Sequence, residues 1–312
     1  MLSDILNIVL PVFIVITLGF LLKRLGLFDD AFVHQTNRLV YYLALPLLLF
    51  YGIGTADFST NFNGALVLAS GAAIVAGFCI SYGYAALRGY PPATRGTFSM
   101  GAFRGNLAYV GLAIVTNAYG QTGFARAGIL MGFLVPVLNF FAIAALLLPH
   151  RNSGRARGAY FWLRQMLFNP LVVASFAGIL WSFLHLRMPV VLERSLKITT
   201  GMSLPLALIA IGGSFSLAKL RGDLLMAGIA ASIKLLWLPL IAAALLIACG
   251  VSGQELGIGV LLAATPTATA SYIMAHQMKG DAELAASIVM LSTLLSIFSY
   301  TLILYLLRSK GI

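Results

Sequence analysis

The amino-acid sequence predicts an all-α integral membrane protein with ten transmembrane helices, arranged as two inverted five-helix repeats. Three observations predict this fold class: an apolar composition, ten separate apolar runs and a partial internal repeat. Of the 312 residues, 60% are hydrophobic and only 9% are charged, and the mean hydropathy is +0.97. A water-soluble domain has about a quarter of its residues charged. The composition therefore excludes a soluble enzyme, a disordered chain and a secreted disulfide-rich domain.

Ten apolar runs account for most of the chain. The hydrocarbon core of a bilayer is about 30 Å thick, and a helix of roughly 20 apolar residues crosses it. Dividing the chain at its polar clusters gives the runs 5–22, 33–51, 66–87, 97–118, 124–148, 161–184, 190–215, 224–248, 256–278 and 284–307. The longest polar stretch, 150–158, is expected to be a cytoplasmic linker. It separates a first repeat, residues 1–149, from a second, residues 159–312.

The distribution of lysine and arginine predicts the orientation of the chain. These residues are enriched in cytoplasmic loops. If the N-terminus lies outside, the inner loops carry eleven of the 20 Lys and Arg and the outer side carries five. Both termini are therefore predicted to lie outside, in a multi-pass protein of the plasma (inner) membrane. The net charge of +11 does not indicate nucleic acid, because the basic residues are scattered over short loops.

An internal repeat is visible in the sequence. With five helices in each half, the second half must enter the membrane in the opposite sense to the first, as in inverted repeats. A shift of 159 residues places Pro11 on Pro170, Gly19 on Gly178, residues 45–47 on 204–206, and Gly54 on Gly213. A shift of 160 places Gly120 on Gly280 and sets Asn106 against Pro266. The repeat is clearer in helices one and two than in helices four and five.

The fourth and ninth runs contain residues that interrupt helices. Gly105 and Gly111 weaken the fourth run, and Pro266 removes a backbone donor from the ninth. Backbone groups freed in this way cannot face lipid, so such breaks line a cavity or are covered by protein. Two breaks at matching places would bring half-helix ends together, and the N-terminal ends offer amide donors to an anion. The sequence therefore predicts a site at the midplane.

A series of motifs in chain order resembles the auxin efflux carrier family, in its bacterial branch of malonate- and malate-permease-like proteins. The motifs are LALPLLLF, RGNLAYVGLAIVTNAYG, SLPLALIAIGGSFSL and PTATASYIMAHQMKGDAELAASIVMLSTLLS, and the resemblance covers essentially the whole chain. It implies a ten-helix carrier of organic anions, whose scaffold and transport domains each draw helices from both repeats and whose fourth and ninth helices cross as unwound segments. The family's crossover asparagine matches Asn106, whereas Ala113 and Ser271 stand where plant members have proline.

Two cations, Arg104 and Lys234, are predicted near mid-depth, and an ionisable residue inside a membrane is a functional candidate by default. Arg104 either binds substrate, snorkels towards the inner face or caps the broken helix. Lys234 either neutralises a substrate carboxylate, replaces a cation or contacts a backbone carbonyl. Asn106 has both a donor and an acceptor, which suit substrate contact as well as an N-cap.

Five further side chains near the breaks are candidates for substrate binding. The hydroxyls of Thr267, Thr269 and Ser271 either bind the ligand or satisfy freed carbonyls. Tyr109 and Tyr272 either contact the ligand or pack between helices. Cys79 and Cys249 have no nearby Cys or His in the sequence, which argues against a disulfide framework, and the sequence indicates no particular metal ligands.

The expected function is secondary transport of a small organic anion, a mono- or dicarboxylate, by alternating access. Export of an auxin-like aromatic weak acid is the alternative within this class, and an anion channel is the alternative outside it. An intramembrane enzyme is disfavoured because all nine acidic residues lie at or outside the span ends. No cofactor and no nucleic acid are expected. The expected partners are the anion and the bilayer; the coupling ion, a proton or sodium, and a homodimer are left open.

Overall fold

The computed structural model describes residues 1–149, 168–215 and 223–312, so the predicted linker, 150–158, lies outside the described residues. The chain forms two compact units. The first comprises Met1–Gly64, Ala108–Val135 and Leu167–Phe215, and the second comprises Ala65–Leu107, Pro136–Met166 and Ser216–Ile312. Each unit therefore contains segments from both sides of the predicted linker.

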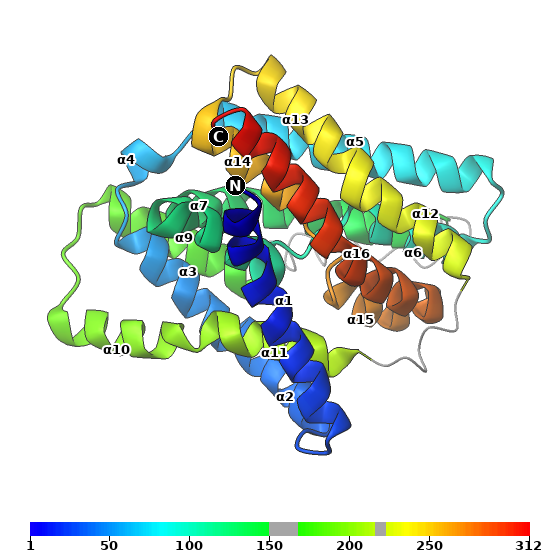
Figure 1. Cartoon of the computed structure of the whole chain (residues 1–312), viewed down its shortest axis with the longest axis horizontal. Helices are drawn as coiled ribbons and strands as arrows, with labels where there is room; N and C mark the ends of the chain where they lie inside the picture. The colour runs from blue at the N-terminus through cyan, green and yellow to red at the C-terminus, as the bar shows by residue number, and fades with distance from the viewer. Residues whose placement is uncertain (150–167, 216–222) are drawn as a thin grey trace. The chain divides into compact units, whose positions relative to one another are not determined.

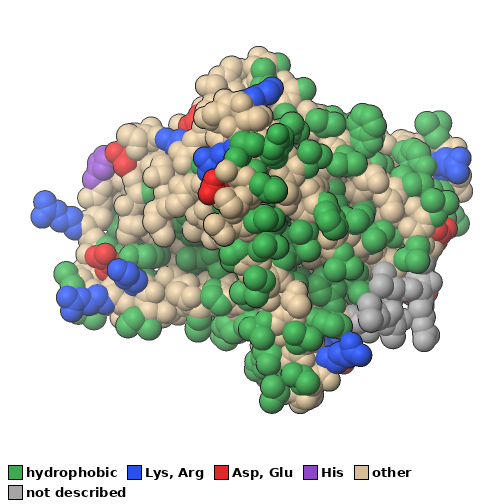
Figure 2. Space-filling model, in the orientation of Figure 1, with side chains coloured by type: hydrophobic (Ala, Val, Ile, Leu, Met, Phe, Trp, Pro, Cys, Tyr) green, Lys and Arg blue, Asp and Glu red, His purple; other side chains and the backbone are tan. Residues whose placement is uncertain are grey.

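All the regular secondary structure of the described residues is helical (Figure 1). Within this part of the chain, seven helical stretches are long and apolar enough to cross a membrane: Leu2–Arg24, Asp30–Gly54, Gly64–Leu87, Leu107–Leu147, Val190–Ser214, Leu224–Ala248 and Ala282–Ser309. Figure 2 shows hydrophobic side chains spread over the visible face, with few charged ones. Such a surface suits contact with lipid.

The predicted runs that do not form one long helix are the fourth, sixth and ninth. The fourth is split into α6 (Pro92–Phe103) and a second part that joins the fifth run in α7 (Leu112–Leu147), where Gly120 has a non-helical φ of 64° and ψ of −154°. The described part of the sixth is α9 (Pro170–Phe183). The ninth is split into α14 (Gly253–Ala263) and α15 (Ala270–Gln277). The arrangement of ten spans stays a prediction.

Glycines set the helix spacing in the first unit. There α1 (Leu2–Arg24) packs on α11 (Ser203–Ser214), and α3 (Leu45–Gly54) packs on α9. A Cβ at Gly19 in α1 would collide with the carbonyl of Ile209 in α11. A Cβ at Gly178 in α9 would lie 3.1 Å from the carbonyl oxygen of Phe50 in α3. Small residues let helix backbones approach closely in membranes.

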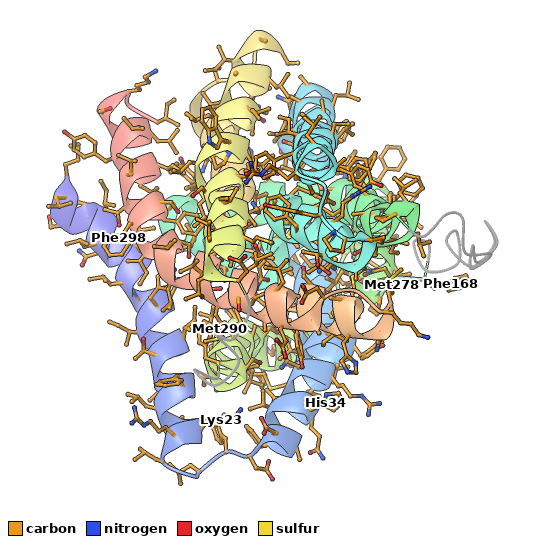
Figure 3. The ribbon with its side chains drawn as sticks, turned by 90° about the vertical axis from the view of Figure 1, so that its right-hand side faces the viewer. Lys23, His34, Phe168, Met278, Met290 and Phe298 are labelled. Atoms are coloured by element: carbon orange, nitrogen blue, oxygen red, sulfur yellow. The ribbon has the colours of Figure 1, made fainter. Side chains whose placement is uncertain are left out.

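The other helices of the first unit are α2 (Asp30–Leu39), the π-turn η1 (Val40–Ala44), α4 (Phe58–Asn61), α10 (Val190–Gly201) and the first part of α7. Figure 3 shows Lys23 and His34 on the two arms of the hairpin formed by α1 and α2. Lys23 Nζ donates to Asp30 Oδ1 over 2.6 Å, which ties the turn of this hairpin.

The contacts of the first unit follow the internal repeat. Gly19 contacts Ile209, and Gly178 contacts Phe50. A shift of 159 residues carries Gly19 onto Gly178 and Phe50 onto Ile209, so the two contacts are equivalent. A further contact joins two equivalent positions to each other, because Ser203 Oγ donates to the Ala44 carbonyl over 2.9 Å at a sequence separation of 159. Such pairs are expected where a chain folds as two repeats about a two-fold axis.

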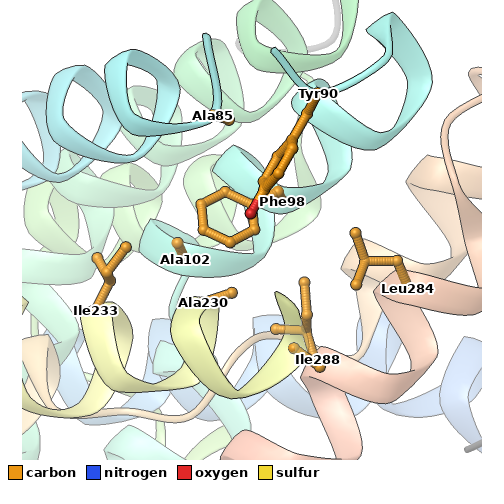
Figure 4. Packing of buried hydrophobic residues seen from close by; sticks show 9 residues of the cluster. Ala85, Tyr90, Phe98, Ala102, Ala230, Ile233, Leu284 and Ile288 are labelled. Carbon is orange, nitrogen blue, oxygen red and sulfur yellow. The ribbon is translucent and has the colours of Figure 1, made fainter. Parts of the chain in front are cut away.

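Besides α6, α14, α15 and the last part of α7, the second unit contains α5 (Gly64–Leu87), α12 (Leu224–Ser232), the π-turn η5 (Ile233–Trp237), α13 (Leu238–Ala248) and α16 (Ala282–Ser309). Helix α6 packs against α12, η5 and α16. Phe98 of α6 is fully buried, stacks on Tyr84 and packs in one cluster with Ile288 and Ala230 (Figure 4). This cluster fixes α6 and so positions the break at its C-terminal end.

Polar contacts join the start of α6 to the turn between α15 and α16. Asp281 caps α16 by accepting from the Leu284 amide, and Thr94 Oγ1 donates to its second carboxylate oxygen over 3.2 Å. The Asp281 amide in turn donates to Thr97 Oγ1 over 2.9 Å. The far end of α15 is therefore attached to the same helix as the break.

We expect Gly19→Ala to lower the thermal stability of the purified protein. A backbone carbonyl on α11 cannot turn away as a side chain can, and overpacking a tight contact costs about 1–3 kcal/mol. Gly71→Ala in α5 is the matched control, because a Cβ there would meet no atom within 4 Å. Thermal unfolding in detergent measures both variants. Equal melting temperatures for the two variants would contradict the close contact between α1 and α11.

Candidate functional site

Two helix breaks lie against each other in the second unit. The first covers residues 104–106, between α6 and the π-turn η2 (Leu107–Gly111), and the second covers residues 264–269, between α14 and α15. Gly105 and Thr267 form an isolated antiparallel β-bridge. The two segments therefore cross with their backbones paired, and we call residues 104–106 and 264–269 the crossing.

Backbone hydrogen bonds hold the crossing together. The Asn106 amide donates to the Pro266 carbonyl over 2.8 Å, and the Ala268 amide donates to the Arg104 carbonyl over 3.0 Å. Arg104 itself is extended, with φ −77° and ψ 97°, and it ends α6. The pairing gives partners to backbone groups that have left their helices.

Local sequence explains why each helix breaks at this place. Pro266 lacks an amide hydrogen and cannot donate to the carbonyl of Leu262, one helical turn earlier. Thr265 Oγ1 donates to that carbonyl instead, over 2.9 Å. On the other segment, a Cβ at Gly105 would collide with Thr265 Oγ1 and lie 3.4 Å from Lys234 Cε. Glycine is therefore needed where the two segments touch.

The last carbonyls of the two half-helices are bonded by side chains from other elements. Thr267 Oγ1 donates over 2.7 Å to the carbonyl of Gly101 in the last turn of α6. The Thr267 amide donates to Ser292 Oγ of α16 over 3.1 Å, so it does not continue α14. Lys234 Nζ, from η5, donates over 2.5 Å to the carbonyl of Ala263, the last residue of α14. Lys234 thus contacts a backbone carbonyl, one of the roles expected for it.

Arg104 extends from the crossing towards α15 and α7. Its guanidinium donates to Ser271 Oγ over 3.4 Å and to Asn139 Oδ1 over 3.1 Å. Ser271 lies in the first turn of α15, where the helix has a positive partial charge. The guanidinium and the N-terminus of α15 both contribute positive potential at this place.

The remaining candidates have different positions. Asn106 is buried, with 7% of its surface exposed. Thr269 occupies the N-cap position of α15 without a side-chain cap bond, and Tyr272 is half-buried with its ring 6.5 Å from that of His276. Tyr109 belongs to η2 in the first unit and is buried there.

The structure brings seven of the predicted residues together in the second unit, namely Arg104, Gly105, Asn106, Lys234, Pro266, Thr267 and Ser271. Gly111 is not part of a break, because it ends η2 and the chain continues directly into α7. Sequence reasoning missed Asn139, Thr265 and Ser292. Asn139 and Ser292 are polar residues in apolar runs, and Thr265 precedes the helix-breaking Pro266. These positions are the signals by which the sequence could have indicated them.

The helices and the crossing are those of a multi-pass membrane protein with two interrupted helices paired in one unit. A family model described as membrane transport protein matches residues 4–304. The chain therefore belongs to this family, the auxin efflux carrier family, and is an integral membrane transporter. This confirms the resemblance found in the sequence motifs.

Two relatives match over nearly their whole lengths. A protein of Rhizobium meliloti (strain 1021) named "Putative malonate transporter" is 27% identical, with 99% of this chain and 98% of the relative covered. An "Uncharacterized transporter" of Methanothermobacter thermautotrophicus is also 27% identical, with 94% of this chain and 95% of the relative covered.

We expect Thr267→Val to destabilise the protein, because it removes the donor to the Gly101 carbonyl while keeping the side-chain shape. Leaving a buried acceptor unsatisfied costs about 1–3 kcal/mol. Thr301→Val in α16 is the matched control, because Thr301 donates within its own helix to the Ile297 carbonyl. Thermal unfolding in detergent compares the two variants. If Thr267→Val melts no lower than the control, the hydroxyl is not needed at the crossing.

Proposed function

We propose that the protein is a secondary carrier of a small organic anion, a mono- or dicarboxylate, that works by alternating access and binds the anion at the crossing. The position of Arg104 carries this proposal. Its guanidinium bonds to Ser271 in the first turn of α15, so a fixed cation and a helix N-terminus contribute positive potential at the same place. Anions bind readily at such a place, and charged residues inside membranes mark substrate pathways.

The relative from Rhizobium meliloti supports a carboxylate as the substrate, since its name includes malonate. A carboxylate can accept two parallel hydrogen bonds from one guanidinium, which makes arginine a good partner for it. The Asn106 side chain offers a donor and an acceptor in the same break. We therefore assign substrate contact to Arg104 and Asn106, with Thr269, Ser271 and Tyr272 as further candidates, while a substrate contact of Tyr109 in the first unit stays a prediction from the sequence.

We further infer that the fold is the ten-helix inverted repeat. The equivalent glycine contacts of the first unit support it, as does the contact between Ser203 and Ala44. In the second unit, the 160-residue shift pairs Asn106 with Pro266, and these two residues are hydrogen-bonded at the centre of an antiparallel pairing. Antiparallel pairing is the relation that a two-fold axis imposes on two equivalent segments.

We expect Arg104→Gln to weaken malonate binding by about tenfold or more, because a hydrogen bond to a charged group contributes about 1.5–3 kcal/mol. Asn106→Ala should abolish uptake while expression and folding remain. Saturable uptake and counterflow of malonate in liposomes measure transport and separate a carrier from a channel. Arg187→Gln, at an exposed position of the first unit, is the control. If both site variants match this control, the anion does not bind at the crossing.

The membrane orientation can be tested with introduced cysteines in a variant whose own exposed Cys79 and Cys249 are replaced by serine. Cysteines at Asp57 and Glu255 should react with an impermeant thiol reagent added outside the cell. Cysteines at Asn152 and Arg221, which lie outside the described residues, should react only when the inner face is accessible. The excess of lysine and arginine in the predicted inner loops leads to this expectation, and the reverse pattern would overturn the orientation.

A further inference from the structure

The buried lysine of the second unit has a defined partner. Lys234 is completely buried, and it lies in the π-turn η5 within the apolar helical stretch Leu224–Ala248. Single π-turns inside helices are rare and are frequent at functional sites. Burying an ammonium group costs several kcal/mol unless a partner compensates for the lost water. The contacts of the Lys234 ammonium group therefore indicate how this cost is compensated.

The partner of Lys234 is the C-terminal end of a half-helix. Its Nζ donates to the carbonyl of Ala263, the residue at which α14 ends. The last carbonyls of a helix carry a negative partial charge, and they cannot reach water inside a membrane. The Thr267 amide, which would bond to Ala263 in a continuous helix, donates instead to Ser292. The Ala263 carbonyl therefore needs a donor from outside α14, and the Lys234 side chain supplies it.

The Ala263 carbonyl is of a kind that transporters use to hold a small cation. Carriers with broken helices coordinate sodium with unwound backbone carbonyls and half-helix C-terminal ends. The Ala263 carbonyl is such an oxygen, and the Thr265 hydroxyl lies beside Gly105, close to the stem of Lys234. Lys234 Cε lies 3.4 Å from where a Cβ of Gly105 would be, so the stem of Lys234 is within reach of both breaks while its ammonium lies at the end of α14.

We propose that Lys234 is a built-in substitute for a coupling cation, and that its ammonium takes the place at the end of α14 that Na⁺ would otherwise occupy. The carrier then has a hydrogen-bond donor of its own at the negative helix end and does not bind or require Na⁺. The part of this proposal that concerns Na⁺ coupling rests on the proposed function. The part that concerns what occupies the end of α14 does not depend on the substrate and can be tested alone.

Thermal unfolding of the purified full-length protein tests the cation place without any substrate. At constant ionic strength, the wild-type melting temperature should be the same in Na⁺ as in N-methyl-D-glucamine, a cation too large for the place. Lys234→Ala should melt lower in N-methyl-D-glucamine and rise by several degrees with Na⁺ or methylammonium, because a ligand that binds only the folded state stabilises it. Lys310→Ala, at an exposed position, is the control and should show no such rise.

Two results would overturn the proposal: a Na⁺-dependent rise in the wild-type melting temperature, or a purified Lys234→Ala protein that responds to neither cation. If Lys234→Ala does not fold, Lys234→Met decides. That variant keeps the stem but not the charge, so it should melt below Lys310→Met in every cation. A melting temperature equal to that of Lys310→Met would show that the charge is not needed.

Uptake of malonate into liposomes tests the consequence for coupling. The wild type should take up malonate equally well in Na⁺ and in N-methyl-D-glucamine, and uptake that needs Na⁺ would overturn the proposal. If the wild type takes up no malonate in either medium, that failure counts against the proposed function, while the melting temperatures still decide the role of Lys234.

Discussion

A helix broken inside a membrane leaves backbone carbonyls that water cannot reach, and the second unit is built around the compensation of these carbonyls. Thr265 bonds within its own segment, Thr267 bonds across to α6, and Lys234 bonds from η5 to the end of α14. Ser292 of α16 accepts the amide that would otherwise have extended α14. Four elements, α6, η5, α14 and α16, are therefore joined through backbone groups that the two interruptions leave without helical partners.

The first unit is stabilised by a different constraint. Lipid tails are as apolar as the side chains, so burial against lipid gives helices little reason to associate. Close contact between backbones supplies the attraction instead, through many van der Waals contacts at Gly19 and Gly178 and through the hydroxyl of Ser203. Gly19 and Gly178 occupy equivalent positions of the repeat, so the same kind of close glycine contact occurs twice within the unit.

The sequence predicted the membrane class, the family and the positions of the breaks near Gly105 and Pro266. It did so because composition, proline and glycine act locally and leave a signal in the chain itself. It could not show that Arg104 bonds to Asn139 or that Lys234 bonds to Ala263, because these pairs join residues far apart in sequence and one partner is a backbone group. The sequence also did not single out Ser292, because it is one of several serines in the same apolar helix.

The short helix α15 is held at both of its ends. At its start, the Ala268 amide pairs with the Arg104 carbonyl, and just beyond its other end Asp281 is attached to Thr94 and Thr97 of α6. These attachments fix the direction of the eight-residue helix relative to α6, and with it the direction of the helix dipole. The electrostatic field at the proposed site is therefore preorganised, so binding an anion demands little rearrangement of the backbone. In the proposed carrier, preference for negative charge then comes from the helix backbone, and discrimination between carboxylates of different length comes from the side chains around it.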